Sequence, residues 1–467
     1  MLKPPFDIAG DLDTPVSAFI KLAAFAPRFL LESVEGGERL GRYSFIGFGD
    51  GLEVRLDRDA LFIGGERRPA PADGAALLAA LREALRRAPQ PRPDIAGVPL
   101  AGGLVGYAAY DVVRSFERVS APTLSGVPLL HYVAPCSLLV FDHLTRGIAL
   151  LHAGSEQERR SLRTEIISAL RGALPGAGRR VGRYSQPTAS YARADYMEGV
   201  RRVQEYIAAG DVYQLVLSAR FEGRHEIEPF QAYRALRLIN PSPYMYYCAL
   251  GDVTVVGSSP EALVKLKDGH AQLRPIAGTR PRSDELSTDL AREAELRADP
   301  KENAEHVMLV DLARNDLGRV ARPGSVRVDP YRAIERYSHV MHIVSGVHGL
   351  LEDSRDAFDL FAAAFPAGTL VGAPKVRAMQ IIAELEPTNR GLYGGTVGYF
   401  GARGDMDHAI TIRTLVFNAD RYSFQAGAGI VADSVPETEY EEVLAKSAAM
   451  GRALEMTCDA SAGGGGL

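Results

Sequence analysis

The chain alternates between two patterns of hydrophobic and polar positions, one typical of helices and one typical of strands. Apolar residues that recur every three or four positions predict helices over residues 74–87, 156–174, 195–209, 299–317, 375–385 and 435–446. Alternating or short apolar runs predict strands over residues 43–48, 52–56, 137–141, 147–151, 212–221, 253–257, 394–400, 407–417 and 421–431. The last three are joined by short turns, as in an antiparallel meander. We therefore expect an α+β fold with antiparallel sheets rather than a Rossmann fold.

Shifts in composition indicate where the chain divides. The segment from Leu174 to Arg180 is rich in Pro, Gly and Arg, and residues 182–194 continue it as a linker. This boundary gives an N-terminal α+β region over residues 1–180 and a second domain over residues 190–457. The glycine-rich end, residues 458–467, is predicted to be disordered.

Two of the predicted helices carry paired carboxylates. Glu302 and Glu305 share one face of the first, and Glu439 and Glu442 share one face of the second. Such pairs usually lie on a solvated helix face, so neither pair alone establishes a site. If the two helices face each other, however, their oxygen ligands favour a hard cation, and the absence of Cys or paired His favours magnesium over zinc.

Composition excludes several classes of partner. The 467 residues are 46% apolar with a net charge of -5, and no basic stripe indicates nucleic-acid binding. No apolar run predicts a membrane segment or a signal peptide. Three scattered cysteines indicate free thiols in a reducing compartment, and none lies in a nucleophile motif. We expect a cytoplasmic protein.

Four long motifs occur in one order along the chain. They span residues 275–282 (Pro-Ile-Ala-Gly-Thr-Arg-Pro-Arg), 305–316, 368–375 and 425–434. With these motifs the chain resembles the chorismate-utilising enzymes, and more closely the large subunits (component I) of anthranilate synthase. The resemblance is strongest over residues 195–454. It implies large antiparallel sheets in a sandwich-like core flanked by helices.

The same resemblance implies a reaction. In a magnesium-dependent step, ammonia adds at C2 of chorismate as the 4-hydroxyl leaves, and loss of pyruvate then gives anthranilate, the first step of tryptophan biosynthesis. Glu305 and Glu442 fall on the metal positions, with Glu302 and Glu439 in support. A carboxylate of the substrate also suits the cation, which it can bridge.

The remaining site residues follow from the motifs. The substrate contacts are Gly278, Thr279, Tyr393 and Arg413, with the backbone donors of Gly427, Ala428 and Gly429. An arginine fork suits a carboxylate because it donates two parallel hydrogen bonds. Glu261 is the expected general acid for the leaving hydroxyl, and His342, supported by Thr369, is expected to handle the proton in the pyruvate-loss step. A histidine on a strand is also common as an ordinary hydrogen-bonded residue.

Two positions distinguish members of the family. Relatives that add water carry a lysine base where this chain has Gln214, and an amide cannot deprotonate water. Aminodeoxychorismate synthases typically carry a nucleophilic lysine in place of Ala277. Anthranilate synthase is therefore favoured. Aminodeoxychorismate synthase component I is the alternative enzyme, and a module that only binds an aromatic acid is the alternative outside catalysis.

A partner and an effector are also implied. Because the chain has no amidotransferase cysteine motif, we expect a separate glutamine amidotransferase subunit (component II) that supplies ammonia, in a heterotetramer. The family suggests feedback inhibition by tryptophan, with effector contacts at Ser33, Pro243, Tyr244 and Met245. Lys375 and Lys446 have no assigned role at this stage.

Overall fold

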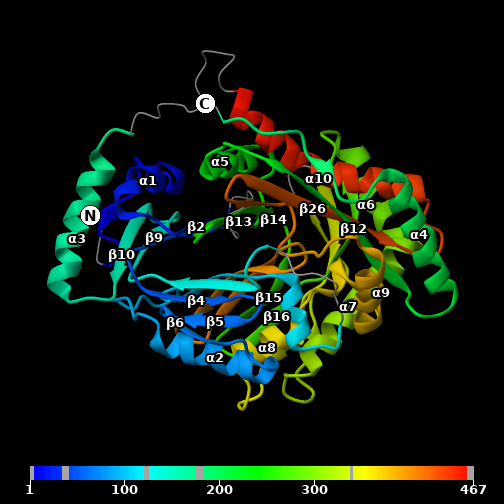
Figure 1. The fold of residues 1–467 in the computed structure, drawn as a ribbon, viewed down its shortest axis with the longest axis horizontal. Helices are drawn as coiled ribbons and strands as arrows, with labels where there is room; N and C mark the ends of the chain where they lie inside the picture. Colours follow the sequence, from blue (N-terminus) through cyan, green and yellow to red (C-terminus); the bar gives the residue numbers. More distant parts are fainter. Residues whose placement is uncertain (1–4, 34–40, 120–125, 175–181, 337–339, 460–467) are drawn as a thin grey trace.

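Two large antiparallel sheets form the centre of the computed structural model, which describes residues 5–33, 41–119, 126–174, 182–336 and 340–459 (Figure 1). Within these residues, the first sheet has 12 strands, of which β22 (Gly372–Ala373) pairs with β12 off the main path. Its main path runs β1 (Ile8–Ala9), β10 (Gly147–His152), β9 (Ser137–Asp142), β3 (Tyr43–Phe48), β2 (Phe29–Glu32), β13 (Tyr244–Leu250), β14 (Val253–Ser259), β25 (Thr414–Asn418), β26 (Arg421–Ile430), β12 (Gln214–Arg224) and β11 (Thr188–Ala189).

The second sheet has 11 strands among the same described residues, and a small third sheet has three. The second runs β18 (Arg327–Val328), β21 (Val347–Leu350), β16 (His270–Leu273), β15 (Ala262–Lys267), β24 (Met406–Ile410), β23 (Thr396–Gly401), β7 (Gly103–Ala108), β8 (Leu130–Ala134), β4 (Leu52–Leu56), β5 (Ala60–Ile63) and β6 (Glu66–Pro69). The third runs β17 (Ile276–Pro281), β20 (Val340–Val344) and β19 (Ala333–Arg336).

Helices flank the sheets. Over the first sheet lie α1 (Pro15–Lys21), α4 (Arg193–Ala208), α5 (Pro229–Ile239) and α10 (Pro436–Asp459), and over the second lie α2 (Gly74–Arg87) and α8 (Ala357–Ala364) (Figure 1). The others are α3 (Glu156–Arg171), α6 (Leu286–Ala298), α7 (Pro300–Gly318), α9 (Lys375–Leu385) and the 3-10 helices η1 (Ala23–Phe25), η2 (Tyr110–Ser115) and η3 (Gly368–Leu370). No helix of the described residues is both long and apolar enough to cross a membrane.

The core confirms the predicted sandwich. One buried cluster takes side chains from both large sheets, including Phe45 and Tyr246 of the first and Tyr107, Val133 and Tyr399 of the second. Burying apolar surface on two facing sheets is what holds such a sandwich together. The prediction of an α+β fold with antiparallel sheets flanked by helices is therefore confirmed.

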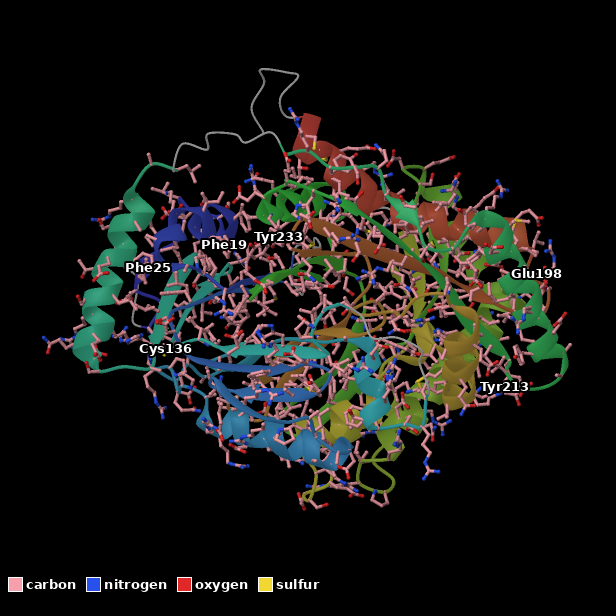
Figure 2. All side chains as sticks on the ribbon, viewed as in Figure 1. Phe19, Phe25, Cys136, Glu198, Tyr213 and Tyr233 are labelled. Carbon is pink, nitrogen blue, oxygen red and sulfur yellow. The ribbon has the colours of Figure 1, made fainter. Side chains whose placement is uncertain are left out.

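Strands from both ends of the chain are interleaved in both large sheets. Early β2 pairs with β13, and early β7 pairs with β23. Side chains reinforce the junction, where Phe19 stacks on Phe230 with ring centroids 4.3 Å apart and the Tyr233 hydroxyl donates to Glu32 (Figure 2). The boundary predicted near residue 180 thus divides the sequence but not the sheets.

The predicted strand over residues 407–417 is wrong in one respect, because it is two strands. β24 belongs to the second sheet and β25 to the first, and the chain crosses between the sheets at Arg413. Arg413 has a φ of 50°, a left-handed backbone that a continuous strand cannot contain. The predicted meander of three strands is therefore split between two sheets, and Arg413 lies at the crossover.

The predicted tail begins later than expected. Helix α10 continues through Asp459, two residues into the segment that the sequence predicts to be disordered. The Cys458 thiol helps to hold this end because it donates to the carbonyl of Gly182 at 2.8 Å. Residues 460–467 lie outside the described residues.

A buried ion pair joins three parts of the fold. Arg390 donates to both carboxylate oxygens of Glu386, at 2.9 and 2.7 Å, and both side chains are at least 97% buried. The same guanidinium donates to the carbonyls of Leu370 and Val216, while Glu386 accepts from the backbone N–H and the hydroxyl of Ser218. Saturated bonding of this kind is what makes a buried charge pair tolerable.

We expect Arg390→Ala to lower the free energy of unfolding by about 3–5 kcal/mol, because the Glu386 carboxylate would stay buried without its cation. Urea denaturation followed by circular dichroism measures this. The matched control is Arg201→Ala, which breaks an exposed pair with Glu198 and should cost under about 1 kcal/mol. The double variant Glu386→Leu/Arg390→Met should cost less than the single one. An effect of Arg390→Ala no larger than the control's would contradict this account.

Candidate active site

The candidate general acid, Glu261, lies in the link between β14 and β15. The Thr369 hydroxyl, on η3, donates to its Oε1 at 3.1 Å. Burial raises the pKa of Glu261 to about 7, although the Thr369 hydrogen bond and the charge of Arg413 oppose the rise. A small cavity of about 40 Å³ lies beside both side chains. Near neutral pH this carboxyl therefore holds a proton that it can donate, as a general acid must.

The candidate base, His342, lies on β20 beside the bulged strand β17. Its Nδ1 donates to the carbonyl of Gly278 at 2.9 Å and lies 3.1 Å from the Thr279 hydroxyl. This bond selects the tautomer in which Nε2 is the basic nitrogen. Burial lowers the pKa of His342, so the ring is neutral at physiological pH. A neutral imidazole can accept a proton.

Position 278 requires glycine. Its φ is +67°, and a Cβ there would lie 2.8 Å from Leu296 and 3.1 Å from a carboxylate oxygen of Glu302. Only glycine adopts this backbone without strain and leaves that space open. The bulge of β17 at this point brings the Gly278 carbonyl, which accepts from His342, close to the first acidic helix, α7.

Arg413 is close to both candidate groups. Its charge lowers the pKa of Glu261 and of His342, so the guanidinium lies within electrostatic range of the acid and the base. Backbone bonds fix the two segments, because the Ser258 N–H donates to the Arg413 carbonyl and the Ile410 N–H donates to the Glu261 carbonyl. The crossover between the sheets thus places a cation within electrostatic range of the acid, where it suits an anionic substrate.

Strand β26 forms one wall of the site. A Cβ on Gly427 would lie 2.8 Å from the Tyr393 hydroxyl, and a Cβ on Gly429 would lie 2.6 Å from the amide nitrogen of Gln214. In the described chain, β25 pairs with β26 only as far as Ser423, so the glycine-bearing half has β12 along one edge and no β25 partner along the other. Glycines keep this backbone accessible. Ala428 alternates with them and is fully buried.

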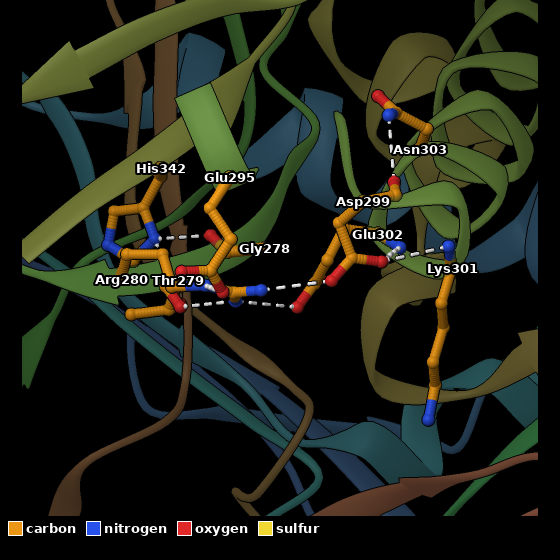
Figure 3. A network of polar contacts seen from close by, with 9 residues as sticks. All are labelled: Gly278, Thr279, Arg280, Glu295, Asp299, Lys301, Glu302, Asn303 and His342. Atoms are coloured by element: carbon orange, nitrogen blue, oxygen red, sulfur yellow. Dashed lines mark hydrogen bonds and ion pairs between the residues drawn. The ribbon is translucent and has the colours of Figure 1, made fainter. Parts of the chain in front are cut away.

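The first acidic helix, α7, is anchored to β17 by a charge network (Figure 3). Asp299 caps the helix by accepting from the N–H groups of Lys301 and Glu302 at 2.9 and 3.2 Å. Arg280 of β17 then bridges Glu295, Asp299 and Glu302 at 2.8, 2.9 and 3.3 Å. Burial, and after it the charge of Glu305, raise the pKa of Glu302 against this pairing. Sequence reasoning missed Arg280, although it lies within a quoted motif.

The second acidic helix, α10, begins at Pro436, one residue after the start that the sequence predicts. Lys446 lies one turn after Glu442, with its Nζ 2.6 Å from Glu442 Oε1, and it also donates to the carbonyl of Gly427 at 3.1 Å. Burial, opposed by the Ser434 hydrogen bond and aided by Glu442, raises the pKa of Glu439. Lys446, which had no role in the sequence, thus links the helix to the glycine-bearing strand.

Lys301, in the first turn of α7, has its Nζ 3.9 Å from Asp433, three residues before α10 begins. The side-chain amide of Gln214, on β12, donates to Glu305 of α7 at 3.2 Å. In the part of the chain that the structure describes, no three His, Cys, Asp or Glu side chains converge on a common point that could hold a metal. The carboxylates therefore lie as two pairs, and their oxygen donors suit a hard cation that a substrate carboxylate also binds.

The other lysine without an assigned role is structural. Lys375, at the start of α9, lies 2.8 Å from Asp316 of α7, and both side chains are largely buried. Burial raises the pKa of Asp316, and the lysine opposes this rise. This pair ties η3 and the following helix to the acidic helix, so it helps to place Thr369.

The predicted effector residues line a single cavity of about 330 Å³, which is separate from the site around Glu261. The four are Ser33, Pro243, Tyr244 and Met245. The Tyr244 hydroxyl donates to Asp407 at 2.9 Å, and Lys265 Nζ lies 3.2 Å from Asp407 and 5.3 Å from the Tyr244 ring centroid. The cavity therefore combines an aromatic wall with both signs of charge.

One segment serves both sites. Pro260 and Ala262 line the larger cavity, and Glu261 and Ala262 line the smaller one, so Ala262 borders both. A molecule in the larger cavity would thus touch the residues on either side of the candidate acid.

Comparison with known proteins identifies the class. A model of the chorismate binding enzyme family matches residues 26–452, so the chain belongs to the chorismate-binding enzymes. The prediction of a chorismate-utilising enzyme is therefore confirmed.

Within this class the relatives share one name. Anthranilate synthase component 1 of Thermus thermophilus is 47% identical over 96% of both chains, and that of Pseudomonas putida is 45% identical over 97% of this chain and 95% of the relative. The crystal structure of anthranilate synthase component I from Streptococcus pneumoniae matches with a TM-score of 0.79 and 33% identity, covering 95% of this chain and 98% of that one. These matches confirm the predicted likeness to anthranilate synthase and do not favour aminodeoxychorismate synthase.

The pKa of Glu261 predicts how the rate depends on pH. Only the protonated carboxyl can donate, so kcat/KM for chorismate, measured at a fixed concentration of neutral ammonia, should fall as the pH rises through about 7. The Thr369 hydrogen bond lowers this pKa, so Thr369→Val should move the fall to higher pH, whereas the partly exposed control Thr288→Val, on α6, should not. The same profile in all three proteins would exclude Glu261 as the acid.

Proposed function

We propose that this protein catalyses the anthranilate synthase reaction, in which chorismate and ammonia give anthranilate, pyruvate and water. The Glu261 carboxyl, whose pKa burial raises to about 7 and which lies within electrostatic range of Arg413, is the observation that carries the proposal. The names of the relatives support the same reaction. A buried acid beside a cation suits a substrate that is anionic and must lose a poor leaving group.

We assign substrate binding to Arg413 and to the glycine-bearing strand β26. Arg413 offers a fork for one carboxylate of chorismate, and the backbone edge of Gly427 and Gly429, which has no β25 partner, offers N–H donors for the other. Tyr393, whose hydroxyl lies over Gly427, orients the ring between them. The bulged Gly278 and Thr279 complete this pocket on the side of His342.

Magnesium is part of the proposal, held by Glu305 and Glu442 with Glu302 and Glu439 in support. Burial, and after it the neighbouring carboxylate, raise the pKa of Glu302 and of Glu439, and a bound cation would favour the charged form of both. A bound cation would supply charge stabilisation for a carboxylate of the substrate. Gln214 and Lys446 would hold Glu305 and Glu442 in position.

The two proton transfers fall to different residues. Glu261 gives its proton to the 4-hydroxyl, which leaves as water while the ammonia nitrogen forms its bond to C2. His342 Nε2 then takes the proton on C2, and the bond between C3 and the enolpyruvyl oxygen breaks to release pyruvate. The hydrogen bond from Nδ1 to Gly278 holds the ring in the tautomer that this step needs.

The first test mixes the lone protein with chorismate, a magnesium salt and an ammonium salt, and identifies the products by fluorescence and mass. We expect anthranilate and pyruvate, and we expect Glu305→Gln to reduce turnover by about 10² or more, since one carboxylate charge at the cation site is lost. Glu198→Gln, an exposed change on α4, is the control. Isochorismate or aminodeoxychorismate as the product, or full activity of Glu305→Gln, would contradict the proposal.

Ammonia is supplied, we infer, by a separate glutamine amidotransferase subunit, in a heterotetramer. The relatives' printed name, component 1, supports a partner component. The three cysteines of this chain also support it. Cys248 is buried, burial raises the pKa of Cys136, and the Cys458 thiol donates to the carbonyl of Gly182, so none resembles an activated nucleophile. A cytoplasmic location remains the prediction for both subunits.

The larger cavity is proposed as the tryptophan effector site. Tyr244 and Met245 offer an apolar wall for an indole ring, while Asp407 and Lys265 offer charges for an amino acid's ammonium and carboxylate groups. Ser33, which also lines this cavity, offers a hydroxyl for a hydrogen bond. The position of Pro260 and Ala262 beside Glu261 gives a bound effector a direct way to disturb the acid.

We expect Ser33→Ala to weaken inhibition by tryptophan about 2–10-fold, because one hydrogen bond contributes about 0.5–1.5 kcal/mol. The inhibition constant and calorimetric binding of tryptophan both measure this change, and kcat without tryptophan should stay the same. The control is Ser168→Ala, an exposed position on α3. Unchanged tryptophan affinity in Ser33→Ala would rule out this contact.

A further inference from the structure

The third sheet presents different side chains on its two faces. Helix α6 covers one face, where an apolar cluster packs, formed by Leu296, Met341 and Ile343. Alternate residues lie on the other face, so Thr279 of β17, His342 of β20 and Glu335 of β19 share it. The candidate base therefore lies between a hydroxyl and a carboxylate, one on each neighbouring strand.

Glu335 lies directly opposite His342 where β19 pairs with β20. Opposed residues of an antiparallel pair have Cβ atoms about 4.5–5.5 Å apart, so the two side chains are neighbours. The electrostatics of the ring agree with this register. Burial lowers the pKa of His342 and the charge of Arg413 lowers it further, whereas the Gly278 hydrogen bond and the charge of Glu335 raise it. The carboxylate thus favours the positively charged form of the ring.

Arg274 holds the Glu335 carboxylate. It lies in the link between β16 of the second sheet and β17 of the third, and its guanidinium donates to Glu335 Oε1. Arg274 and Glu261 both line the smaller cavity, and Arg274 also lines the larger one. Within the described chain, it is the only charged side chain that the two cavities share. The pair therefore ties the strand beside the base to the segment beside the acid.

The pair of Arg274 and Glu335 contributes little to stability. Both side chains are 33% exposed, and water screens ion pairs at such exposure. The position of the carboxylate opposite His342 is what distinguishes this pair from others on the surface. A carboxylate beside a catalytic histidine stabilises the imidazolium that forms when the ring takes up a proton. Glu335 is placed to do this for the candidate base.

We propose that Glu335 is a positioning residue for the pyruvate-loss step, in which its carboxylate, held by Arg274, stabilises the imidazolium that forms on His342. The inference rests on the proposed function. His342 Nε2 takes the proton on C2 of the aminated ring, the electrons of that C–H bond form the double bond between C2 and C3, and the C3–O bond breaks. The imidazolium then returns the proton to the methylene carbon of the released enolpyruvate, which becomes pyruvate. Glu335 neither gains nor loses a proton in this sequence.

Glu335→Gln tests this role because it removes the charge and keeps the size of the side chain. In a single turnover with chorismate, a magnesium salt and an ammonium salt, release of pyruvate should slow about tenfold, since one charge that favours the imidazolium is lost. Chorismate should be consumed at the parent rate. The aminated intermediate, which still carries the enolpyruvyl group, should therefore accumulate and be detected by mass. Glu335→Asp keeps the charge and should accumulate less of it.

Glu293→Gln is the matched control. Glu293 of α6 pairs with Arg336, the residue after Glu335 on β19, so it anchors the same strand from the other face of the sheet. This variant should form anthranilate as fast as it consumes chorismate, as the parent does. Equal accumulation of the intermediate in Glu293→Gln and Glu335→Gln would mean that loosening β19 is enough, and it would overturn the proposal.

The double variant Glu335→Gln/His342→Gln decides whether Glu335 acts through the base. If it does, the double variant should release pyruvate as slowly as His342→Gln alone, because no imidazolium remains to be stabilised. Arg274→Gln should accumulate less intermediate than Glu335→Gln, since the carboxylate stays but is no longer held. Losses that multiply in the double variant, or release of pyruvate at the parent rate by folded Glu335→Gln, would overturn the proposal. If the parent itself makes no anthranilate and pyruvate, the proposed function fails.

Discussion

The buried ion pair of Arg390 and Glu386 is the interaction on which the rest of the site depends. Arg390 donates to the carbonyl of Leu370, the residue after Thr369, and lies over the ring of Tyr393. Glu386 accepts from Ser218 of β12, the strand that pairs with the glycine-bearing strand β26. A charged pair out of contact with water tolerates little displacement, because each lost hydrogen bond exposes an uncompensated charge. Thr369, the glycine-bearing strand β26 and the Tyr393 ring are therefore held at fixed separations.

Local patterns were enough to predict many elements and one face of the site. The helices over residues 74–87 and 375–385 and the strand over residues 43–48 have the bounds that their periodicity predicts. The strand predicted over residues 212–221 contains Gln214, and in the structure its amide donates to Glu305. Such predictions succeed because the periodicity of a strand or helix depends only on residues that are close together in the sequence.

Other features depend on partners far away in the sequence. Nothing around Arg413 signals a left-handed residue, since threonine and isoleucine flank it, and only the two separate sheets require the crossover. The Glu-Pro-Thr-Asn-Arg segment that contains the buried ion pair reads as a turn. Its charges could be interpreted only once Ser218 and Val216 were known to lie against them. The assignments of metal, substrate and effector residues came from resemblance and still stand as proposals.

The interleaved sheets also constrain how the protein is made. Strand β7 must wait for β23, its sheet neighbour, which leaves the ribosome about 300 residues later. At about 5–20 residues per second, this open edge persists for about 15–60 seconds during synthesis. Unpaired strand edges pair readily with other chains. The nascent chain must therefore carry exposed apolar strands through most of its translation, and chaperones that shield such edges would decide how much of it reaches the native state.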